Sequence, residues 1–405
     1  MKKLICAVLI LSALNVSADN WTQKASIPDS CLRAPSSFSI GTKGYVCGGG
    51  YWSNTWSKSL WEYDQLSNVW TQKADYGGGV IQGPTALVIQ GKGYVGLGWN
   101  QMGSMSQKSW WQYDPNTNIW VQKADFGGGR RGASFPFSIN NKGYVFGGID
   151  SISNCLNDLW EYDATLDNWT QKTSCPCLGR FEGISFSINS EGYMGGGINS
   201  TGIYPTDFWA YNPITDNWTQ KATIPINEFV DNGYFSIGNY GYVTCGEISS
   251  GYLTTLWQYN SITDQWVTKA SFPGNSRDEV ASFSIGNYGY VGWGGKDGNP
   301  LYNDFYQYTP DSSEMGASIN EITLQQITTT VYPNPFKNTT TIKFSEQLHN
   351  ATVKIMDAQG KLVKRYELGV SSEAEINLTG VAKGTYFVEV MDEKKLLATQ
   401  KIVVE

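Results

Sequence analysis

Histidine is almost absent from this chain, since the only one in 405 residues is His349, near the C-terminal end. A catalytic Ser-His-Asp or Cys-His group therefore cannot form in residues 19–326. Histidine-ligated copper or zinc is excluded from the same region. We expect no metal and no cofactor.

Charged residues are also scarce, at 16% of the chain, and their sign is uneven. Residues 19–326 hold 17 Lys+Arg against 27 Asp+Glu, a net charge of −10, whereas residues 327–405 hold 10 against 9, a net charge of +1. An acidic main region repels phosphate backbones, so nucleic acid is not an expected partner.

Long apolar runs are missing beyond the N-terminus. Residues 1–18 contain two lysines, an apolar run from Leu4 to Leu14 and the small residues Ser17 and Ala18. This pattern is typical of a secretory signal peptide that is cleaved after Ala18. No later stretch is long and apolar enough to cross a bilayer, so no transmembrane segment is predicted.

Cysteine is infrequent but even in number once residues 1–18 are removed: Cys31, Cys47, Cys155, Cys175, Cys177 and Cys245. Six cysteines in an exported chain permit disulfides. The Cys175-Pro176-Cys177 segment resembles half of a metal site, but no second pair or histidine lies nearby to complete four ligands. The disulfide we expect joins Cys155 to Cys175 or Cys177.

The chain is rich in glycine and aromatic residues, and these recur with a period of about 49 residues. The motif Trp-(Thr/Val)-(Gln/Thr)-Lys occurs at Trp21, Trp70, Trp120, Trp169, Trp218 and Trp266. Each period contains four short runs with strand-like alternation, separated by tight turns. A repeated four-stranded antiparallel sheet of this length is a propeller blade, so the sequence predicts an all-β propeller with six blades.

The order of the motifs predicts how the ring closes. The first three strands occur six times, but the last copy lacks its Trp strand, and the strand at Trp21 precedes all copies. We therefore predict that the strand at Trp21 completes the sixth blade, which removes an exposed sheet edge.

This pattern resembles the kelch family over residues 21–311. Its features are a glycine pair after an aromatic strand, as at Gly48-Gly49, and a Tyr that precedes a turn and a Trp. The second and fifth copies depart at Gly96-Leu97-Gly98 and Cys245-Gly246-Glu247. The resemblance implies a six-bladed β-propeller over 19–311. The lack of histidine argues against the copper site of galactose-oxidase-like kelch enzymes, whereas sialate mutarotases are metal-free six-bladed kelch proteins.

Residues 312–326 are polar and are interpreted as a linker, after which the repeat is lost. A Pro333-Asn334-Pro335 start, an Asp357-x-x-Gly-Lys turn and the Gly384-Thr385-Tyr386 strand follow. They resemble the type A C-terminal sorting domain of the type IX secretion system of Bacteroidetes-type bacteria. The resemblance implies a small Ig-like β-sandwich over 327–405, recognised by the secretion machinery and removed by a sortase-like peptidase. The protein would then be secreted or attached to the cell surface; the alternative is a sandwich with a binding role.

In such a propeller, the loops that lead into each innermost strand lie on the same face as the loops between the second and third strands. Both sets are long and varied, so we expect the ligand site there. The first set, which we call the lead-in loops, carries Arg33, Gln82, Arg131, Arg180, Glu228 and Arg277 about one period apart, followed by Glu182, Asp231 and Glu279. The arginines would grip carboxylate or hydroxyl groups of a ligand, or else would bind loop carbonyls and the nearby acids.

Aromatic residues on this face add a second indication. Trp52 and Trp56 lie in a long loop, where they would stack on sugar rings or hold the loop down. We interpret the protein as an exported binding protein for a carbohydrate or a protein ligand. The alternative is a metal-free enzyme acting on acidic sugars, similar to sialate mutarotases, in which Glu182, Asp231 and Glu279 converge for acid–base catalysis.

Overall fold

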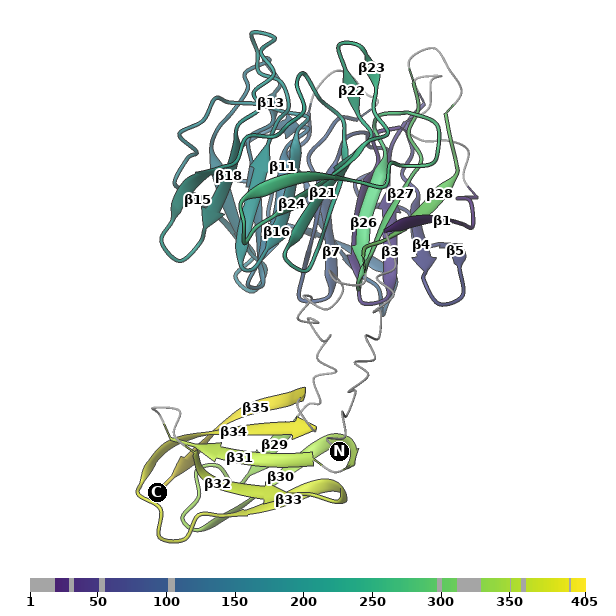
Figure 1. The fold of residues 1–405 in the computed structure, drawn as a ribbon. Helices are drawn as coiled ribbons and strands as arrows, with labels where there is room; N and C mark the ends of the chain where they lie inside the picture. The colour runs from purple at the N-terminus through teal and green to yellow at the C-terminus, as the bar shows by residue number, and fades with distance from the viewer. Residues whose placement is uncertain are drawn as a thin grey trace, which may run out of the picture. The chain divides into compact units, whose positions relative to one another are not determined.

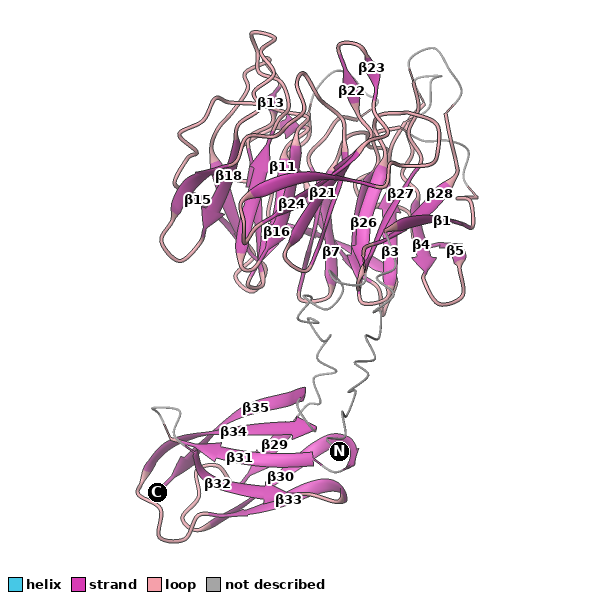
Figure 2. Ribbon diagram, in the orientation of Figure 1, coloured by secondary structure: helices cyan, strands magenta, loops and turns pink. Residues whose placement is uncertain are grey.

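The computed structural model describes residues 19–28, 33–50, 55–100, 106–296, 301–311, 329–349, 351–357, 362–392 and 395–405. These residues form β-strands and no helix (Figures 1 and 2), so none of their segments is a helix that could cross a membrane. The chain divides into two compact units after Ser318. The predicted signal peptide and linker lie outside the described residues and stay predictions.

The described part of the first unit contains six antiparallel four-stranded sheets, and we number these blades 1 to 6 along the chain. Two small two-stranded sheets lie in its loops: β10 (Arg131–Gly132) with β13 (Ile149–Asp150), and β22 (Glu247–Ile248) with β23 (Gly251–Tyr252). From inside to outside, blade 1 holds β2 (Ser36–Ile40), β3 (Lys43–Cys47), β4 (Leu60–Asp64) and β5 (Val69–Gln72). Blade 2 holds β6 (Thr85–Ile89), β7 (Lys92–Gly96), β8 (Trp110–Asp114) and β9 (Ile119–Lys123). Blade 3 holds β11 (Phe135–Ile139), β12 (Lys142–Phe146), β14 (Leu159–Asp163) and β15 (Asn168–Lys172).

The remaining blades repeat this order. Blade 4 holds β16 (Ile184–Ile188), β17 (Glu191–Gly195), β18 (Phe208–Asn212) and β19 (Asn217–Lys221). Blade 5 holds β20 (Gly233–Ile237), β21 (Tyr240–Thr244), β24 (Leu256–Asn260) and β25 (Gln265–Lys269). Blade 6 holds β26 (Ala281–Ile285), β27 (Tyr288–Gly292), β28 (Phe305–Thr309) and, outermost, β1 (Asn20–Lys24). These sheets confirm the predicted fold class.

The innermost strands form a closed ring, in which β2, β6, β11, β16, β20 and β26 each contact the next and β26 contacts β2. Glycine makes this close approach possible. A Cβ atom on Gly44 would lie 2.1 Å from the ring of Phe283 in the neighbouring blade, and one on Gly93 would lie 2.4 Å from Phe38. In five of the six Gly-Tyr pairs the glycine accommodates an aromatic ring from the preceding blade, whereas Gly143 accommodates Leu87.

The strand at the start of the described chain completes the last blade. β1 pairs with β28 in antiparallel register, with Trp21 opposite Tyr308. The Trp21 ring lies 5.1 Å from that of Tyr308 and 5.4 Å from that of Phe272 between centroids. Its indole N–H donates a hydrogen bond to the Ala270 carbonyl at 2.7 Å. Segments almost 290 residues apart in sequence thus share one sheet.

A recurring hydrogen-bonded link, which we call the staple, joins neighbouring blades. In blade 1, Asn68 Oδ1 accepts hydrogen bonds from Tyr63 of its own blade at 2.9 Å and from the backbone N–H of Ala25, after β1, at 3.0 Å. The Trp70 indole donates to the carbonyl of the same Ala25 at 3.0 Å. The equivalent staple residues are Asn118, Asp167, Asp216, Asp264 and, in blade 6, Asp19.

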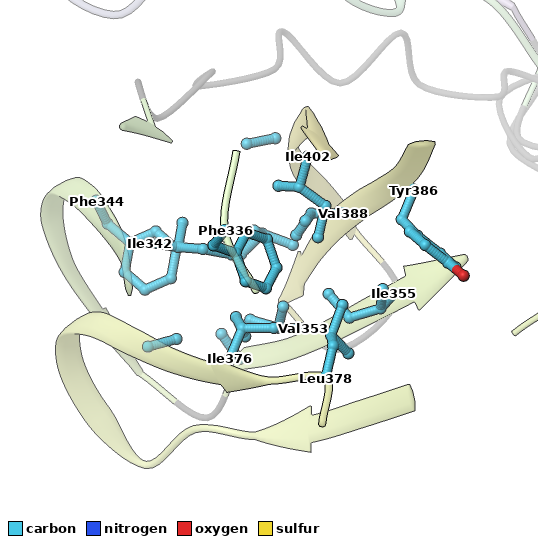
Figure 3. Close-up of a cluster of buried hydrophobic side chains, with 14 of the residues drawn as sticks. Phe336, Ile342, Phe344, Val353, Ile355, Ile376, Leu378, Tyr386, Val388 and Ile402 are labelled. Carbon is cyan, nitrogen blue, oxygen red and sulfur yellow. The ribbon is translucent and has the colours of Figure 1, made fainter. Parts of the chain in front are cut away.

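The described part of the second unit is a sandwich of two sheets. One contains β29 (Thr329–Tyr332), β30 (Thr339–His349) and β33 (Val370–Asn377); the other contains β32 (Leu362–Glu367), β31 (Ala351–Met356), β34 (Gly384–Asp392) and β35 (Lys395–Val404). Buried side chains such as Phe336, Ile342, Val353, Ile376 and Val388 fill the space between the sheets (Figure 3). This unit therefore has its own hydrophobic core.

The expected disulfide from Cys155 is wrong. Cys175 and Cys177 form a disulfide with each other, with Cα atoms 5.1 Å apart, whereas Cys155 is a free cysteine. The reason is local geometry, because the short Cys-Pro-Cys segment directs both sulfur-bearing side chains into the same buried core. Among the described residues, Cys47 and Cys245 are also free and buried, and Cys31 lies outside them.

Candidate ligand site

Three of the predicted arginines are buried inside their blades. Arg131, Arg180 and Arg277 are at most 1% exposed. Each forms a two-pronged ion pair with an aspartate 27 residues further on. The Arg131 nitrogens lie 2.6 and 3.0 Å from the Asp158 oxygens, and those of Arg180 lie 2.5 and 3.0 Å from Asp207; Arg277 pairs with Asp304 in the same way. Such bidentate pairs fix both side chains.

Each of these arginines also donates a hydrogen bond to a backbone carbonyl. Arg131 donates to the Gly147 carbonyl at 3.0 Å, Arg277 to the Trp293 carbonyl at 3.1 Å, and Arg180 to the Leu178 carbonyl at 2.9 Å. Backbone and aspartate oxygens thus surround the guanidinium groups. These contacts support the structural interpretation of the arginines over the one in which they grip a ligand.

The proposed alignment of the lead-in loops also needs correction. Short antiparallel bridges place Arg33 and Gln82 in register with Gly132, Phe181, Val230 and Asp278. Arg131 and Arg180 therefore lie one position earlier than Arg33 and Gln82, in line with the buried Ile81 and Phe229. Arg33 instead forms an ion pair with Glu279, and Glu228 is exposed. The exposed Arg130 donates to the Ser106 carbonyl at 3.3 Å.

A ring of six residues, which we call the collar, encircles the propeller axis two residues before each innermost strand. It consists of Ala34, Gly83, Ala133, Glu182, Asp231 and Glu279, all with φ between +49° and +59°. Backbone N–H groups link the blades: Gly83 donates to Ala34 at 2.9 Å, Glu182 to Ala133 at 3.2 Å, Asp231 to Glu182 at 3.3 Å, Glu279 to Asp231 at 2.9 Å and Ala34 to Glu279 at 3.2 Å. The collar thus lies at the lead-in end of the inner strands.

The two halves of the collar differ in chemistry. Blades 1 to 3 supply alanine or glycine, whereas blades 4 to 6 supply three acidic residues. A left-handed backbone is costly for most residues other than glycine. The inter-blade hydrogen bonds hold Glu182, Asp231 and Glu279 in this conformation, so three carboxyls gather at one side of the axis.

Burial and mutual repulsion change how these carboxyls ionise. Burial, together with the carboxylates of Glu279, Glu247 and Asp278, raises the pKa of Glu182 to about 7. Burial and the carboxylates of Glu182, Glu279 and Asp278 raise the pKa of Asp231 well above its ordinary value. Arg33 opposes both shifts. Near neutral pH the acidic half of the collar therefore retains protons that isolated carboxyls would lose.

Aromatic rings lie on the small-residue side. A Cβ atom on Gly83 would lie 2.6 Å from the Trp99 ring, and one on Gly132 would lie 2.5 Å from it, so Trp99 rests on the backbone of two lead-in loops. Trp99 is half-buried. Trp56 lies against Gly50, next to Gln82, while Trp52 falls outside the described residues. The sequence predicts Trp52 and Trp56 on this face but gives no indication that Trp99 lies there.

A hollow with a volume of about 400 Å³ lies on the opposite face, beside the short turn between β2 and β3. Charged groups around it pair with protein groups: Lys73 lies 3.5 Å from Glu62, and Lys43 pairs with Asp64. No cluster suited to a metal ion occurs among the described His, Cys, Asp and Glu residues.

Two parts of the chain match known families. Residues 136–176 match the family model for the kelch motif, and residues 330–405 match the model for the secretion system C-terminal sorting domain. No curated protein sequence matches the chain. The solved structure of YjhT is similar in fold, with a TM-score of 0.60 and 15% sequence identity over 70% of this chain and 95% of that one.

These matches agree with the fold described above. The kelch match lies within blade 3 and the residues that follow it, and the sorting-domain match covers the sandwich from β29 onward. The chain is therefore a kelch-type β-propeller with a C-terminal sorting domain for type IX secretion, and it is secreted or attached to the cell surface.

Proposed function

We propose that this exported propeller is a binding protein whose collar face takes an uncharged, hydroxyl-rich ligand of the carbohydrate class. The observation that carries the proposal is the gathering of Glu182, Asp231 and Glu279 on one side of a ring that holds the half-open Trp99 on its other side. Acidic groups and one aromatic face are the combination with which proteins hold sugars.

The protonation of the collar suits hydroxyl groups. A sugar hydroxyl both donates and accepts hydrogen bonds. An ionised carboxylate only accepts, whereas a protonated carboxyl also donates. Because the pKa of Glu182 is raised to about 7, its carboxyl binds a proton more tightly than an isolated glutamate does, so the trio offers both kinds of partner. Trp99 adds a flat apolar surface for the less polar face of a sugar ring.

The charge of the site weighs against an anionic ligand. Arg131, Arg180 and Arg277 are bound to aspartates inside the blades, and Arg33 pairs with Glu279 at the collar. A ligand carboxylate would therefore meet clustered acidic groups with little compensating positive charge. For this reason we replace the expectation that arginines grip carboxylate or hydroxyl groups of the ligand by a carboxyl-lined site for neutral sugars.

A glycan array tests the proposal with the chain 19–405 and its variants Glu182→Gln, Asp231→Asn and Trp99→Ala. Loss of a hydrogen bond to a charged group costs about 1.5–3 kcal/mol, so each carboxyl variant should weaken binding roughly tenfold or more. The matched control is Asp125→Asn, which removes an exposed acid paired with Lys108 at 3.0 Å. Binding that survives all three variants, or no glycan binding at all, would contradict the proposal.

A second candidate function, a metal-free enzyme on sugars, is favoured by one observation. A carboxyl with a pKa of about 7 is suited to general acid–base catalysis at neutral pH, and Glu182 has the carboxyl of Asp231 as a neighbour. Interconversion of sugar anomers requires only such proton transfers. Anomer exchange measured by NMR should then exceed the buffer rate and fall to that rate in Glu182→Gln.

A further inference from the structure

Blade 6 differs from the other blades at one turn. In blades 1 to 5 the chain runs without a break from the third strand through a turn to the outermost strand. In blade 6 the third strand, β28, ends at Thr309, and the outermost strand, β1, begins at Asn20. The staple residue of this blade is Asp19, which in sequence is far from the strand that it caps.

A carboxylate lies at this break. The backbone nitrogen of Asp19 donates to Asp311 Oδ1 at 2.8 Å, and Lys269 Nζ lies 2.9 Å from Asp311 Oδ2. The carboxylate of Asp19 is fixed in turn, since its Oδ2 accepts hydrogen bonds from the Ala270 N–H at 2.7 Å and the Tyr308 hydroxyl at 3.0 Å. The side chains of Lys269 and Asp311 are 12% and 22% exposed, so the contact is shielded from water.

We propose that Asp311 is a binding site for the α-ammonium group that forms at Asp19 when the leader is removed. In that step a signal peptidase hydrolyses the bond between Ala18 and Asp19. Water supplies the oxygen that completes the carboxylate of Ala18, and the released amine of Asp19 becomes an ammonium group. The new charge arises 2.8 Å from Asp311 Oδ1, where the nitrogen already lies.

The chemical change strengthens this contact. Before cleavage the nitrogen belongs to a neutral amide with a single N–H. After cleavage it carries a positive charge and three N–H groups, and a charge-assisted hydrogen bond between two ionised groups is roughly twice as strong as a neutral one. The ion pair between Asp19 and Asp311 thus takes the place of the covalent turn of the other blades, and removal of the leader strengthens the closure that the pairing of β1 with β28 provides.

The site also fits only one N-terminal residue. The register of β1 is fixed by the pairing of Trp21 with Tyr308 and by the staple at Asp19. A chain that began at Asn20 would lose the staple carboxylate. A chain that retained Ala18 would place its ammonium group one residue beyond Asp311. Only cleavage directly before Asp19 supplies both the staple and the ion pair.

The test compares three forms of the chain: 19–405 with a free N-terminus, the same chain acetylated at Asp19, and 18–405, each also with Asp311→Asn. Hydrogen exchange of β1 is the local readout, with β9 as the matched outermost strand that has a covalent turn. We expect acetylation or retention of Ala18 to lower Tm by about 2 °C and to speed exchange in β1 but not in β9.

The Asp311→Asn background distinguishes an ion pair from a steric effect. There the three chain ends should give the same Tm and the same exchange in β1. The variant Lys269→Gln, which removes the other partner of Asp311, should keep the difference between the chain ends. The proposal is overturned if the free and acetylated chains behave alike with Asp311 present, or if their difference persists in Asp311→Asn. An exported protein that begins at another residue would overturn it as well.

Discussion

Blades 3, 4 and 6 fill one buried position with an arginine in an ion pair, and blades 2 and 5 fill the equivalent position with an apolar side chain. Arg131, Arg180 and Arg277 occupy the position that Ile81 and Phe229 occupy in the other two blades, and all five side chains are buried. The same backbone therefore accepts a paired charge or a hydrocarbon at this position. A buried arginine in a lead-in loop is therefore explained by its aspartate partner and does not by itself indicate a ligand site. The acidic half of the collar has no such partner that recurs from blade to blade.

The largest expected effect comes from breaking one ion pair. Arg180→Ala leaves Asp207 partly buried without its counter-ion, which should lower the free energy of unfolding by about 3–5 kcal/mol. Denaturant unfolding of the variant and of Arg130→Ala measures the effect, because Arg130 is exposed and its loss should change stability by no more than about 0.5 kcal/mol. Ligand binding per folded molecule should be unchanged.

If Arg180 instead contacted ligand, the results would be reversed. The variant would keep most of its stability and lose binding. The same pair of measurements therefore separates the structural role that the contacts support from the ligand-gripping role that the sequence left open.

The repeat could be predicted from the sequence because each blade is built from neighbouring residues. A period of about 49 residues, marked by Trp and Gly-Tyr, determines four strands per blade and their order without any knowledge of distant contacts. The place of β1 could be predicted as well, since a missing strand at one end and a surplus strand at the other leave one arrangement without an open edge.

The role of the arginines can be predicted from a further pattern in the sequence. In the blades with a buried arginine, the residue directly before the third strand is Asp158, Asp207 or Asp304. Where the arginine is replaced by Ile81 or Phe229, that residue is Ser109 or Thr255. The arginine and the aspartate of a blade are thus either both present or both replaced, which indicates that the two side chains contact each other.

The collar and the disulfide could not be predicted from the sequence in the same way. The collar depends on backbone torsion angles and on hydrogen bonds between blades, which leave no side-chain pattern at Ala34, Gly83 and Ala133. Which of three cysteines come together depends on how one loop turns, and neither spacing nor number determines this.

An intermediate effect is expected from the acidic half of the collar. The pKa of Glu182 is raised from its ordinary value of 4.5 to about 7, so the folded state binds the proton more tightly than the unfolded state. The associated stability is fully present below pH 4.5 and is lost as the pH rises through 7. Glu182→Gln removes this dependence, and at pH 8 the variant should be more stable than the parent by about 1–2 kcal/mol, a value reduced for solvent screening.

Melting curves of both proteins between pH 5 and 8 measure this difference. The stabilising effect of the substitution should grow with pH and vanish near pH 5. Ala133→Gln is the matched control, because it places the same amide on the small-residue side of the collar, where there is no carboxyl cluster to relieve. Parallel pH profiles for the parent and Glu182→Gln would show that folding does not raise the pKa of Glu182.

The smallest effect is expected from converting one type of blade into the other. The double substitution Arg180→Phe with Asp207→Thr gives blade 4 the pair that blade 5 carries at Phe229 and Thr255. Replacing a buried ion pair by apolar residues of similar volume is often neutral or stabilising, since the desolvation of two charges offsets their attraction. The free energy of unfolding of the double variant should therefore lie within about 1 kcal/mol of that of the parent, although Arg180→Ala alone is strongly destabilising.

One hydrogen bond is lost with the aspartate, because the Trp209 indole donates to Asp207 Oδ2 at 2.7 Å. Unfolding of the two single variants and the double variant completes a thermodynamic cycle, and its coupling energy should account for most of the single-variant loss. A double variant as unstable as the singles would mean that the two types of blade are not interchangeable, and that blade 4 needs its charge for another purpose.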